Sequence, residues 1–364
     1  MKTIPLIKPV IAPKNEMMPE IENILYSGYI AQGQAVDDFE AEFAKYIQND
    51  NVLALNSGTG ALHIALALTN VNPGDEVIST AMTSEATNTT IKLMGAKVVW
   101  GDVDSNTGLI DPISVRGKIT ERTKAIIVVH YAGMVCNMDE FNKLSKEFNI
   151  PIIEDSAHAL ASKYDGMPVG SNSEFTCFSF QAIKQMTTVD GGAISFSSNK
   201  YIEEARKLRW FGLSKKVSRL ENDVKRAGFK YNMNNINATI GLVQMRHIRD
   251  IIAVHVSNGK YYDEKLKNIP GITLVPYYDN TEPSYWMYTM RVENRDEFIE
   301  MMQSNGIVAS PLHHRNDTHS VFAESKCDLP SLDKFYNSYV HIPCGSWVNK
   351  GDREYIADII KKGW

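Results

Sequence analysis

Apolar residues recur along the chain in two alternating patterns. Short continuous apolar runs are typical of buried strands, and apolar positions spaced by three or four residues are typical of helices. The runs predict strands at Val52–Leu55, Glu76–Ser79, Lys97–Trp100, Lys124–His130, Pro151–Asp155, Phe175–Phe180 and Ala193–Phe196. The spaced pattern predicts helices over residues 16–26, 36–47, 61–68, 84–94, 138–148 and 202–210. This alternation predicts an α/β fold with a mostly parallel sheet covered by helices.

The pattern changes toward the C-terminus. A long helix is predicted over residues 236–256, and from about Ser257 the strands and helices become shorter. They are predicted at residues 260–266 (helix), 272–275 and 285–292 (strands), and 296–305 and 352–361 (helices). With 364 residues, the chain is long enough for two cores. We therefore expect a large domain over residues 1–250 and a smaller α+β domain over residues 251–364.

The composition and net charge of the chain argue against several classes of binding partner. The net charge is −5 and no basic block is present, so the chain lacks the electrostatic footprint of a nucleic-acid-binding protein. The four cysteines are scattered, which indicates neither a metal site nor a disulfide framework. No apolar run approaches the ~18 residues of a membrane span, and the proline-punctuated N-terminus is unlike a signal peptide. We expect a cytoplasmic protein without metal, membrane or nucleic-acid partners.

Three polar residues follow the ends of neighbouring predicted strands. Asp155 ends one strand, Ser179 lies at the end of the next, and Lys184 comes shortly afterwards. Sites in open α/β sheets gather at the carboxyl ends of strands. A lysine amine condenses with carbonyls, including the aldehyde of pyridoxal phosphate (PLP), and a carboxylate can keep the ring nitrogen of that cofactor protonated. Each residue alone is more often structural, so the evidence is their order and spacing.

A second candidate element is the turn Ser57-Gly58-Thr59, which joins the strand Val52–Leu55 to the next predicted helix. Glycine lets the backbone approach a ligand, and the first N–H groups of a helix attract anions. This turn can therefore bind a phosphate. Many α/β proteins carry similar turns, so it is weak evidence by itself.

The segments EDSAHA, FSFQAIK and TTVDGG resemble motifs of the DegT/DnrJ/EryC1/StrS family, the PLP-dependent aminotransferases of nucleotide sugars. The resemblance runs from about Gly28 to the C-terminus and is strongest between Asn56 and Gln244. It implies a fold-type I enzyme in which Lys184 binds the cofactor and moves the proton, and Asp155 holds the ring nitrogen. It also implies phosphate contacts from Ser57, Gly58, Thr59 and Ser179. His158, where glutamine is commoner, would donate to the pyridoxal O3′.

Three further positions take their expected roles from the same resemblance. The segment GFKYNMNNINA resembles a family segment that reaches the neighbouring subunit, which implies a homodimer with shared active sites and Asn232 at the partner's cofactor phosphate. His313 lies in a Pro-Leu-His segment that lines the substrate side in relatives. Ser84, the other candidate substrate residue, departs from the pattern, because many relatives carry at this position an aromatic ring that stacks on the cofactor.

The resemblance implies transfer of an amino group from an amino acid, L-glutamate being expected, to a keto group of a nucleotide-linked deoxy sugar. One alternative is a different acceptor, a small keto phosphate or an inosose, for which Ser84 leaves room. Another is a PLP-dependent sugar dehydratase, but such relatives carry histidine in place of Lys184. A non-catalytic PLP-binding regulator is the third, and no DNA-binding element accompanies the domain.

Overall fold

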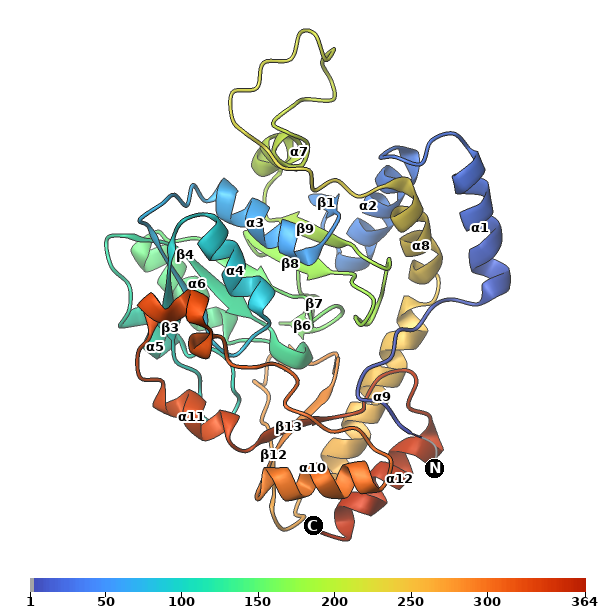
Figure 1. The fold of residues 1–364 in the computed structure, drawn as a ribbon, viewed down its shortest axis with the longest axis vertical. Helices are drawn as coiled ribbons and strands as arrows, with labels where there is room; N and C mark the ends of the chain where they lie inside the picture. Colours follow the sequence, from blue (N-terminus) through green and yellow to red (C-terminus); the bar gives the residue numbers. More distant parts are fainter. Residues whose placement is uncertain (1–2) are drawn as a thin grey trace.

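The computed structural model describes residues 3–364 and has a central seven-stranded sheet (Figure 1). Its strands are β1 (Val52–Leu55), β2 (Glu76–Thr80), β3 (Lys97–Gly101), β4 (Thr123–Val129), β5 (Ile152–Asp155), β8 (Phe175–Ser179) and β9 (Gly192–Phe196). They follow the order β1-β9-β8-β5-β4-β2-β3, and only β9 runs antiparallel to its neighbours. Every residue of β1, β2, β5 and β9 is buried, so both faces of the sheet are covered. The mostly parallel α/β fold is confirmed.

Helices precede and follow these strands along the chain, close to their predicted positions. They are α1 (Lys14–Tyr26), α2 (Gln34–Ile47), α3 (Gly58–Leu68), α4 (Glu85–Leu93), α5 (Pro112–Arg116), α6 (Met138–Phe148) and α7 (Ile202–Arg209). The short α5 was not predicted. α3 begins at Gly58 and not at Ala61, because the Ser57 hydroxyl accepts a hydrogen bond from the Gly60 N–H at 2.9 Å and caps the helix.

The predicted single helix over residues 236–256 is wrong. The chain forms α8 (Asn235–Met245), turns at Arg246 and His247, and continues as α9 (Ile248–Leu266), which also contains the predicted helix 260–266. α8 lies against α1 and α2, and Ile248 and Ile252 at the start of α9 share a core with α8 and α2, whereas Tyr262 and Leu266 near its end belong to the C-terminal core. Residue 250 therefore lies inside α9, and the division at that point stays a prediction.

The C-terminal part is a smaller α+β unit, as expected. Its antiparallel sheet contains β10 (Ile272–Leu274), β12 (Tyr288–Val292) and β13 (Tyr339–Ile342), and its helices are α10 (Arg295–Ser304) and α12 (Lys350–Lys361). The helix α11 (Pro330–Tyr336) packs instead in the core of the large sheet, through Leu332 and Phe335. The strand predicted from Tyr285 begins only at Tyr288, because Tyr285 itself has a φ of 49°. A small sheet joins the two parts by pairing β11 (Thr281–Glu282) with β6 (Lys163–Tyr164), which also pairs with β7 (Met167–Pro168).

Residues 211–229 form a long loop that projects away from the body of the molecule at the top of Figure 1. Leu220, in this loop, is 98% exposed. Phe211, Val217 and Val224 of the same loop are also exposed, and a group of exposed apolar side chains marks a candidate contact region. Among the described residues, none of the helices has the length and apolar character needed to cross a membrane.

Candidate active site

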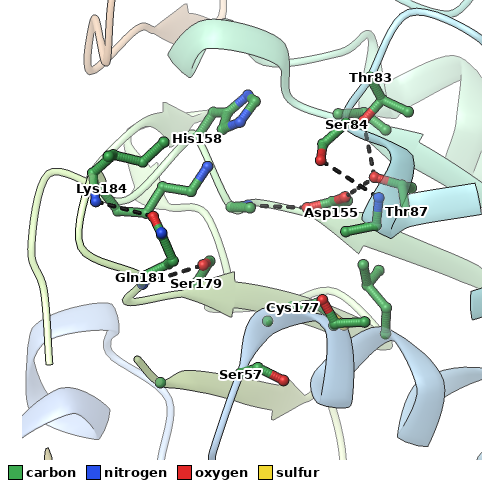
Figure 2. A pocket seen from close by; sticks show the side chains of 18 of the residues that line it. Ser57, Thr83, Ser84, Thr87, Asp155, His158, Cys177, Ser179, Gln181 and Lys184 are labelled. Carbon is green, nitrogen blue, oxygen red and sulfur yellow. Dashed lines mark hydrogen bonds between the residues drawn. The ribbon is translucent and has the colours of Figure 1, made fainter. Parts of the chain in front are cut away.

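The carboxyl ends of β5 and β8 and the N-terminus of α3 open onto one cavity (Figure 2). Nine of the ten site residues proposed from the sequence line it: Ser57, Gly58, Thr59, Ser84, Asp155, His158, Ser179, Lys184 and His313. Asn232 is not among the lining residues. The structure therefore brings nine of the ten residues together around one cavity, and their roles there stay predictions.

Asp155 ends β5 with its carboxylate held from two sides. Oδ2 accepts a hydrogen bond from the Thr87 hydroxyl at 2.7 Å, and Oδ1 accepts one from the Ala157 N–H at 3.1 Å. Thr83 contacts the Thr87 hydroxyl at 2.9 Å, which orders this side of the cavity (Figure 2). Burial raises the pKa of Asp155, and the hydrogen bond from Thr87, the N–H of Ala157 and the charge of Lys184 oppose that rise. Thr87 was not predicted from the sequence. The one feature that could have indicated it is its position one helical turn after Thr83.

Lys184 enters the cavity from the turn after β8. Its backbone N–H donates to the Gln181 carbonyl at 2.9 Å, which closes this turn. Figure 2 shows Lys184 and His158 on the side of the cavity opposite Thr83, Ser84 and Thr87. Burial lowers the pKa of Lys184 to about 7, although the charge of Asp155 acts in the other direction. A lysine of this kind is partly neutral at physiological pH, so it can act as a nucleophile and as a base.

The N-terminus of α3 forms a close-packed cradle. A Cβ on Gly58 would lie 2.8 Å from the Cβ of Ser179, and a Cβ on Gly192 would overlap the backbone of Ser57. The first N–H groups of a helix have no carbonyl partner within the helix. Those of Gly58 and Thr59 therefore belong to the positive end of α3, beside the hydroxyl-bearing Ser179. This arrangement suits a phosphate group.

Two histidines face the cavity in their neutral forms. Burial lowers the pKa of His158 far below its usual value and that of His313 to about 4, and the charge of Lys184 adds to both effects. His158 Nδ1 accepts a hydrogen bond from the Ala132 N–H at 3.4 Å, which assigns its proton to Nε2. Nε2 of His313 is buried without a hydrogen-bond partner among the described residues. Both rings can therefore serve as neutral hydrogen-bonding groups.

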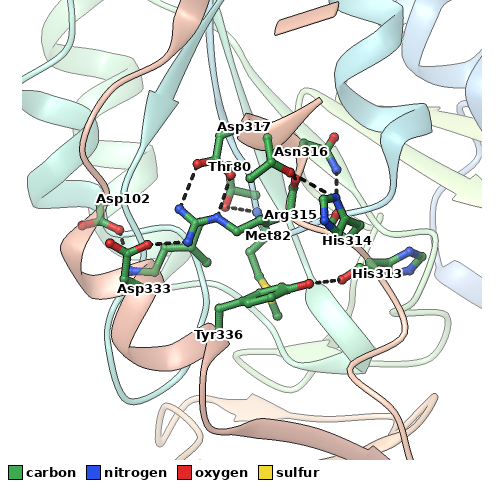
Figure 3. Close-up of polar contacts among 12 residues, drawn as sticks. Thr80, Met82, Asp102, His313, His314, Arg315, Asn316, Asp317, Asp333 and Tyr336 are labelled. Carbon is green, nitrogen blue, oxygen red and sulfur yellow. Dashed lines mark hydrogen bonds and ion pairs between the residues drawn. The ribbon is translucent and has the colours of Figure 1, made fainter. Parts of the chain in front are cut away.

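The loop that presents His313 is firmly held (Figure 3). The Tyr336 hydroxyl donates to the His313 carbonyl at 3.1 Å. Asn316 donates to the Thr83 carbonyl at 2.8 Å and accepts from Asn88 at 2.8 Å, and Arg315 forms ion pairs with two aspartates. These contacts attach the C-terminal loop to the start of α4. The His313 wall and the Ser84 wall of the cavity are therefore fixed relative to one another.

The Ser84 side chain does not replace the aromatic ring that many relatives carry at this position. It is the N-cap of α4, accepting a hydrogen bond from the Ala86 N–H at 3.4 Å. In the described part of the chain, the lining of this cavity includes neither phenylalanine, tyrosine nor tryptophan. The aromatic rings nearest the site, such as Trp286 behind His158, lie outside the lining.

Asn232 lies beside β1, where it pairs with Leu55 in an isolated bridge. Its side-chain oxygen accepts a hydrogen bond from Lys230 Nζ at 2.7 Å. Lys230 in turn lies over the Trp210 ring, with its nitrogen 4.4 Å from the ring centroid. Asn232 is thus placed outside its own chain's cavity, and sequence reasoning did not identify its contact with Lys230.

Within residues 3–364, no cluster of three or more His, Cys, Asp or Glu side chains could hold a metal ion.

Comparisons with known proteins show the family to which the chain is similar. The model of the DegT/DnrJ/EryC1/StrS aminotransferase family matches residues 12–361. The chain is 33% identical to UDP-4-amino-4-deoxy-L-arabinose–oxoglutarate aminotransferase of Shewanella sediminis, over 99% of this chain and 97% of the relative. Among solved structures, the sugar aminotransferase CalS13 of Micromonospora echinospora is 32% identical with a TM-score of 0.95, covering 99% of this chain and 100% of that one.

A second solved structure, AtS13 of Actinomadura melliaura, is 35% identical with a TM-score of 0.95 and covers 100% of both chains. The likeness therefore extends through both the large sheet and the smaller C-terminal unit. The family match is much longer than half the chain and includes every motif that lines the cavity. This chain accordingly belongs to the DegT/DnrJ/EryC1/StrS aminotransferase family and is a PLP-dependent sugar aminotransferase of fold type I.

Proposed function

We propose that this enzyme moves the amino group of L-glutamate to the C4 keto group of a nucleotide-linked sugar, and that Lys184 and Asp155 are its catalytic residues. The observation that carries the proposal is that a lysine with a lowered pKa, a buried carboxylate and the N-terminus of α3 open onto one cavity. The overall change leaves 2-oxoglutarate from the donor and an amino sugar from the acceptor.

The residues of this cavity fit PLP. Glycines allow the backbone to approach closely at Ser57 and Ser179, and the positive end of α3 faces this space, so the phosphate would bind there. Asp155, buried and oriented by Thr87, would face the ring nitrogen. His158, with its proton on Nε2, would donate to the phenolic oxygen. When bound, PLP supplies an aldehyde that accepts an amino group and a ring that withdraws electrons.

Lys184 is proposed to act as both base and acid. Its pKa of about 7 lets the amine take a proton from the substrate carbon and return it at neutral pH. Asp155 would hold the protonated ring nitrogen through its charge, and the hydrogen bonds from Thr87 and the Ala157 N–H favour that charged form against the rise in pKa that burial causes. His313 would bind a hydroxyl or keto oxygen of the sugar through its unpartnered Nε2.

Two observations support the proposed substrates: the name of one relative, and the charged residues in and around the cavity. The Shewanella sediminis relative is named for a UDP-linked 4-amino sugar and for oxoglutarate, which supports a 4-keto nucleotide sugar and glutamate here. No arginine lines the cavity within residues 3–364, so the carboxylates of the donor and the diphosphate of the acceptor need cations from elsewhere. The projecting loop carries Lys215, Lys216, Arg219, Lys225 and Arg226.

We further propose that two copies share their active sites. Asn232 lies outside its own cavity, Lys230 donates to its side-chain oxygen, and its amide NH2 donates to the Met233 carbonyl at 3.4 Å, which leaves the second N–H as a donor. The exposed loop around Leu220 offers an apolar contact to a second chain. In such a homodimer, Asn232 would meet the partner's cofactor phosphate, and the cations of the loop would lie at the mouth of the partner's cavity.

A two-stage experiment tests this function. The PLP-loaded enzyme is first incubated with glutamate, aspartate or alanine, and the change in cofactor absorbance is recorded. It is then mixed with UDP- and TDP-linked 4-keto sugars, a 3-keto nucleotide sugar, an inosose and a small keto phosphate. We expect glutamate to convert the cofactor and a nucleotide-linked 4-keto sugar to restore it fastest. Faster recovery with the inosose or the keto phosphate would contradict the nucleotide-sugar assignment.

A further inference from the structure

Trp286 is a buried tryptophan attached to the turn that carries the reactive lysine. Its side chain is 1% exposed, and it lies in the C-terminal part of the chain just before β12. The indole N–H donates a hydrogen bond to the carbonyl of Ile183, the residue before Lys184, at 3.0 Å. This bond fixes the plane of the indole relative to the lysine.

The Lys184 amine lies over the same indole. Its nitrogen is 4.1 Å from the ring centroid, which is the geometry of a cation–π contact. Among the described residues, no carboxylate lies within ion-pair distance of the Lys184 amine, and the charge of Asp155 favours the charged amine only from farther away. Since a buried ammonium without a partner is costly, the electron-rich face of the indole is the group in contact that favours the charged amine.

The indole also supports the two histidines of the cavity. His158 stacks on Trp286 with ring centroids 3.9 Å apart and an angle of 22° between the planes. His313 lies parallel to His158, with centroids 5.7 Å apart and an angle of 9°. Trp286 therefore contacts the backbone carbonyl of Ile183, the Lys184 amine and the ring of His158.

We propose that Trp286 is a positioning residue that holds the charged Lys184 amine against its indole face whenever the amine is not bonded to the cofactor. The proposal rests on the role proposed for Lys184. During transamination the lysine is released and must stay beside the reacting carbon. A carboxylate partner would bind the ammonium tightly and keep its proton, whereas an aromatic face attracts the ammonium and still allows the proton to leave.

The test uses the cofactor-free protein, so it does not depend on turnover. Lys184 is acetylated with trace acetic anhydride across a pH series, and the modified peptide is measured by mass spectrometry in wild type, Trp286→Phe and Trp286→Leu. Leucine keeps the site apolar but removes the ring, so the charged amine loses its attraction. We expect the pH midpoint of Lys184 acetylation to fall by about half to one pH unit in Trp286→Leu, with Trp286→Phe between.

Lys215 is the matched control in the same digest. Its nitrogen lies 4.8 Å from the centroid of a different ring, Trp210, so its acetylation midpoint must not change with substitution at Trp286. Equal midpoints for Lys184 in all three proteins would overturn the proposal. A rise in Trp286→Leu would also overturn it, because the indole would then act by excluding water. Should the leucine variant fail to fold, fluorinated tryptophan is incorporated at position 286, which keeps the shape of the side chain and weakens the negative face of its ring. The pH midpoint of Lys184 acetylation must then fall.

Activity measurements separate this inference from the proposed substrate. In the loaded enzyme, Trp286→Leu should lower kcat and displace the pH profile of the single-turnover reaction with glutamate, while Trp286→Phe recovers part of the rate. The acetylation midpoint is independent of any acceptor. An incorrect choice of sugar would therefore leave the result for Trp286 standing, and a failed midpoint test would leave the transaminase assignment standing.

Discussion

At the scale of single residues, burial sets the protonation state of the groups in the cavity. It raises the pKa of Asp155, lowers that of Lys184 to about 7 and keeps His158 and His313 neutral. Neutral imidazoles next to a lysine do not compete with it for protons at physiological pH. The cavity therefore contains one basic group that changes charge near pH 7, which is the property that the proposed proton transfer requires.

The first residue-scale prediction concerns Asp155. Asp155→Asn keeps the volume and the bond to Thr87 but removes the negative charge beside the ring nitrogen. We expect kcat to fall at least ~10²-fold, by analogy with the loss of other single electrostatic groups in active sites. Thr87→Val, which leaves the charge in place, is the matched control and should lose much less. Steady-state rates near wild type in Asp155→Asn would mean that another acid takes this role.

The second residue-scale prediction concerns the pH dependence of stability. The folded pKa of Lys184 lies below its unfolded value, so the unfolded chain binds more protons between about pH 7 and pH 10. The free energy of unfolding contributed by this residue therefore rises with pH through that window. Cofactor-free Lys184→Met should be more stable than wild type at pH 6 by roughly 1–4 kcal/mol, a difference that shrinks toward pH 10. Urea denaturation of both proteins at pH 6, 8 and 10 measures this difference in the free energy of unfolding. A difference that does not change with pH would show that burial does not destabilise the charged amine.

At the scale of elements, the sheet and its helices were predictable because their patterns are local. Continuous apolar runs gave all seven strands of the central sheet, and the spaced pattern gave most of the helices. The break between α8 and α9 has no proline or glycine to mark it, so the local sequence gives no signal of the turn at Arg246 and His247. The strand β13 and the helix α11 were missed, since each is short and its identity depends on the partner that it packs against.

The element-scale prediction concerns the N-terminus of α3. In Gly58→Ala the new methyl would lie 2.8 Å from the Ser179 Cβ and force the cradle apart. We expect PLP affinity to fall by ~10-fold or more, because anion binding at a helix N-terminus depends on close backbone approach. Gly117→Ala, whose nearest non-neighbouring atom would be 3.6 Å away, is the control and should bind normally. Titration of the cofactor absorbance measures both, and unchanged affinity in Gly58→Ala would place the phosphate elsewhere.

At the scale of the whole molecule, the site is assembled from segments far apart in the sequence. The family motifs identified the residues of the large sheet, and the Pro-Leu-His segment identified His313. Trp286 and the Asn316 loop contacts could not be predicted, because each joins residues more than one hundred positions apart. A buried tryptophan before a strand is normally part of a core, and its sequence neighbours give no sign that a lysine lies against it.

The prediction at this scale concerns shared active sites. A Lys184→Ala chain and an Asn232→Glu chain should each be inactive, the second because a carboxylate would repel the partner's cofactor phosphate. After subunit exchange at equal concentrations, about a quarter of wild-type activity should return, since half the dimers are mixed and each has one intact site. Size-exclusion and mass measurements verify the exchange. Mixed dimers without activity would place Asn232 in its own chain's site or outside the site altogether.

The central claim is that Lys184 is the residue that bonds to PLP, and one measurement tests it directly. The PLP-loaded enzyme is reduced with borohydride, digested and mapped by mass spectrometry. We expect the pyridoxyl group on the peptide that contains Lys184, with none on Lys215 or Lys230, and no fixed cofactor in Lys184→Ala even though that variant still binds PLP noncovalently. Recovery of the group on another lysine would contradict the assignment of the catalytic residue and of the cavity built around it.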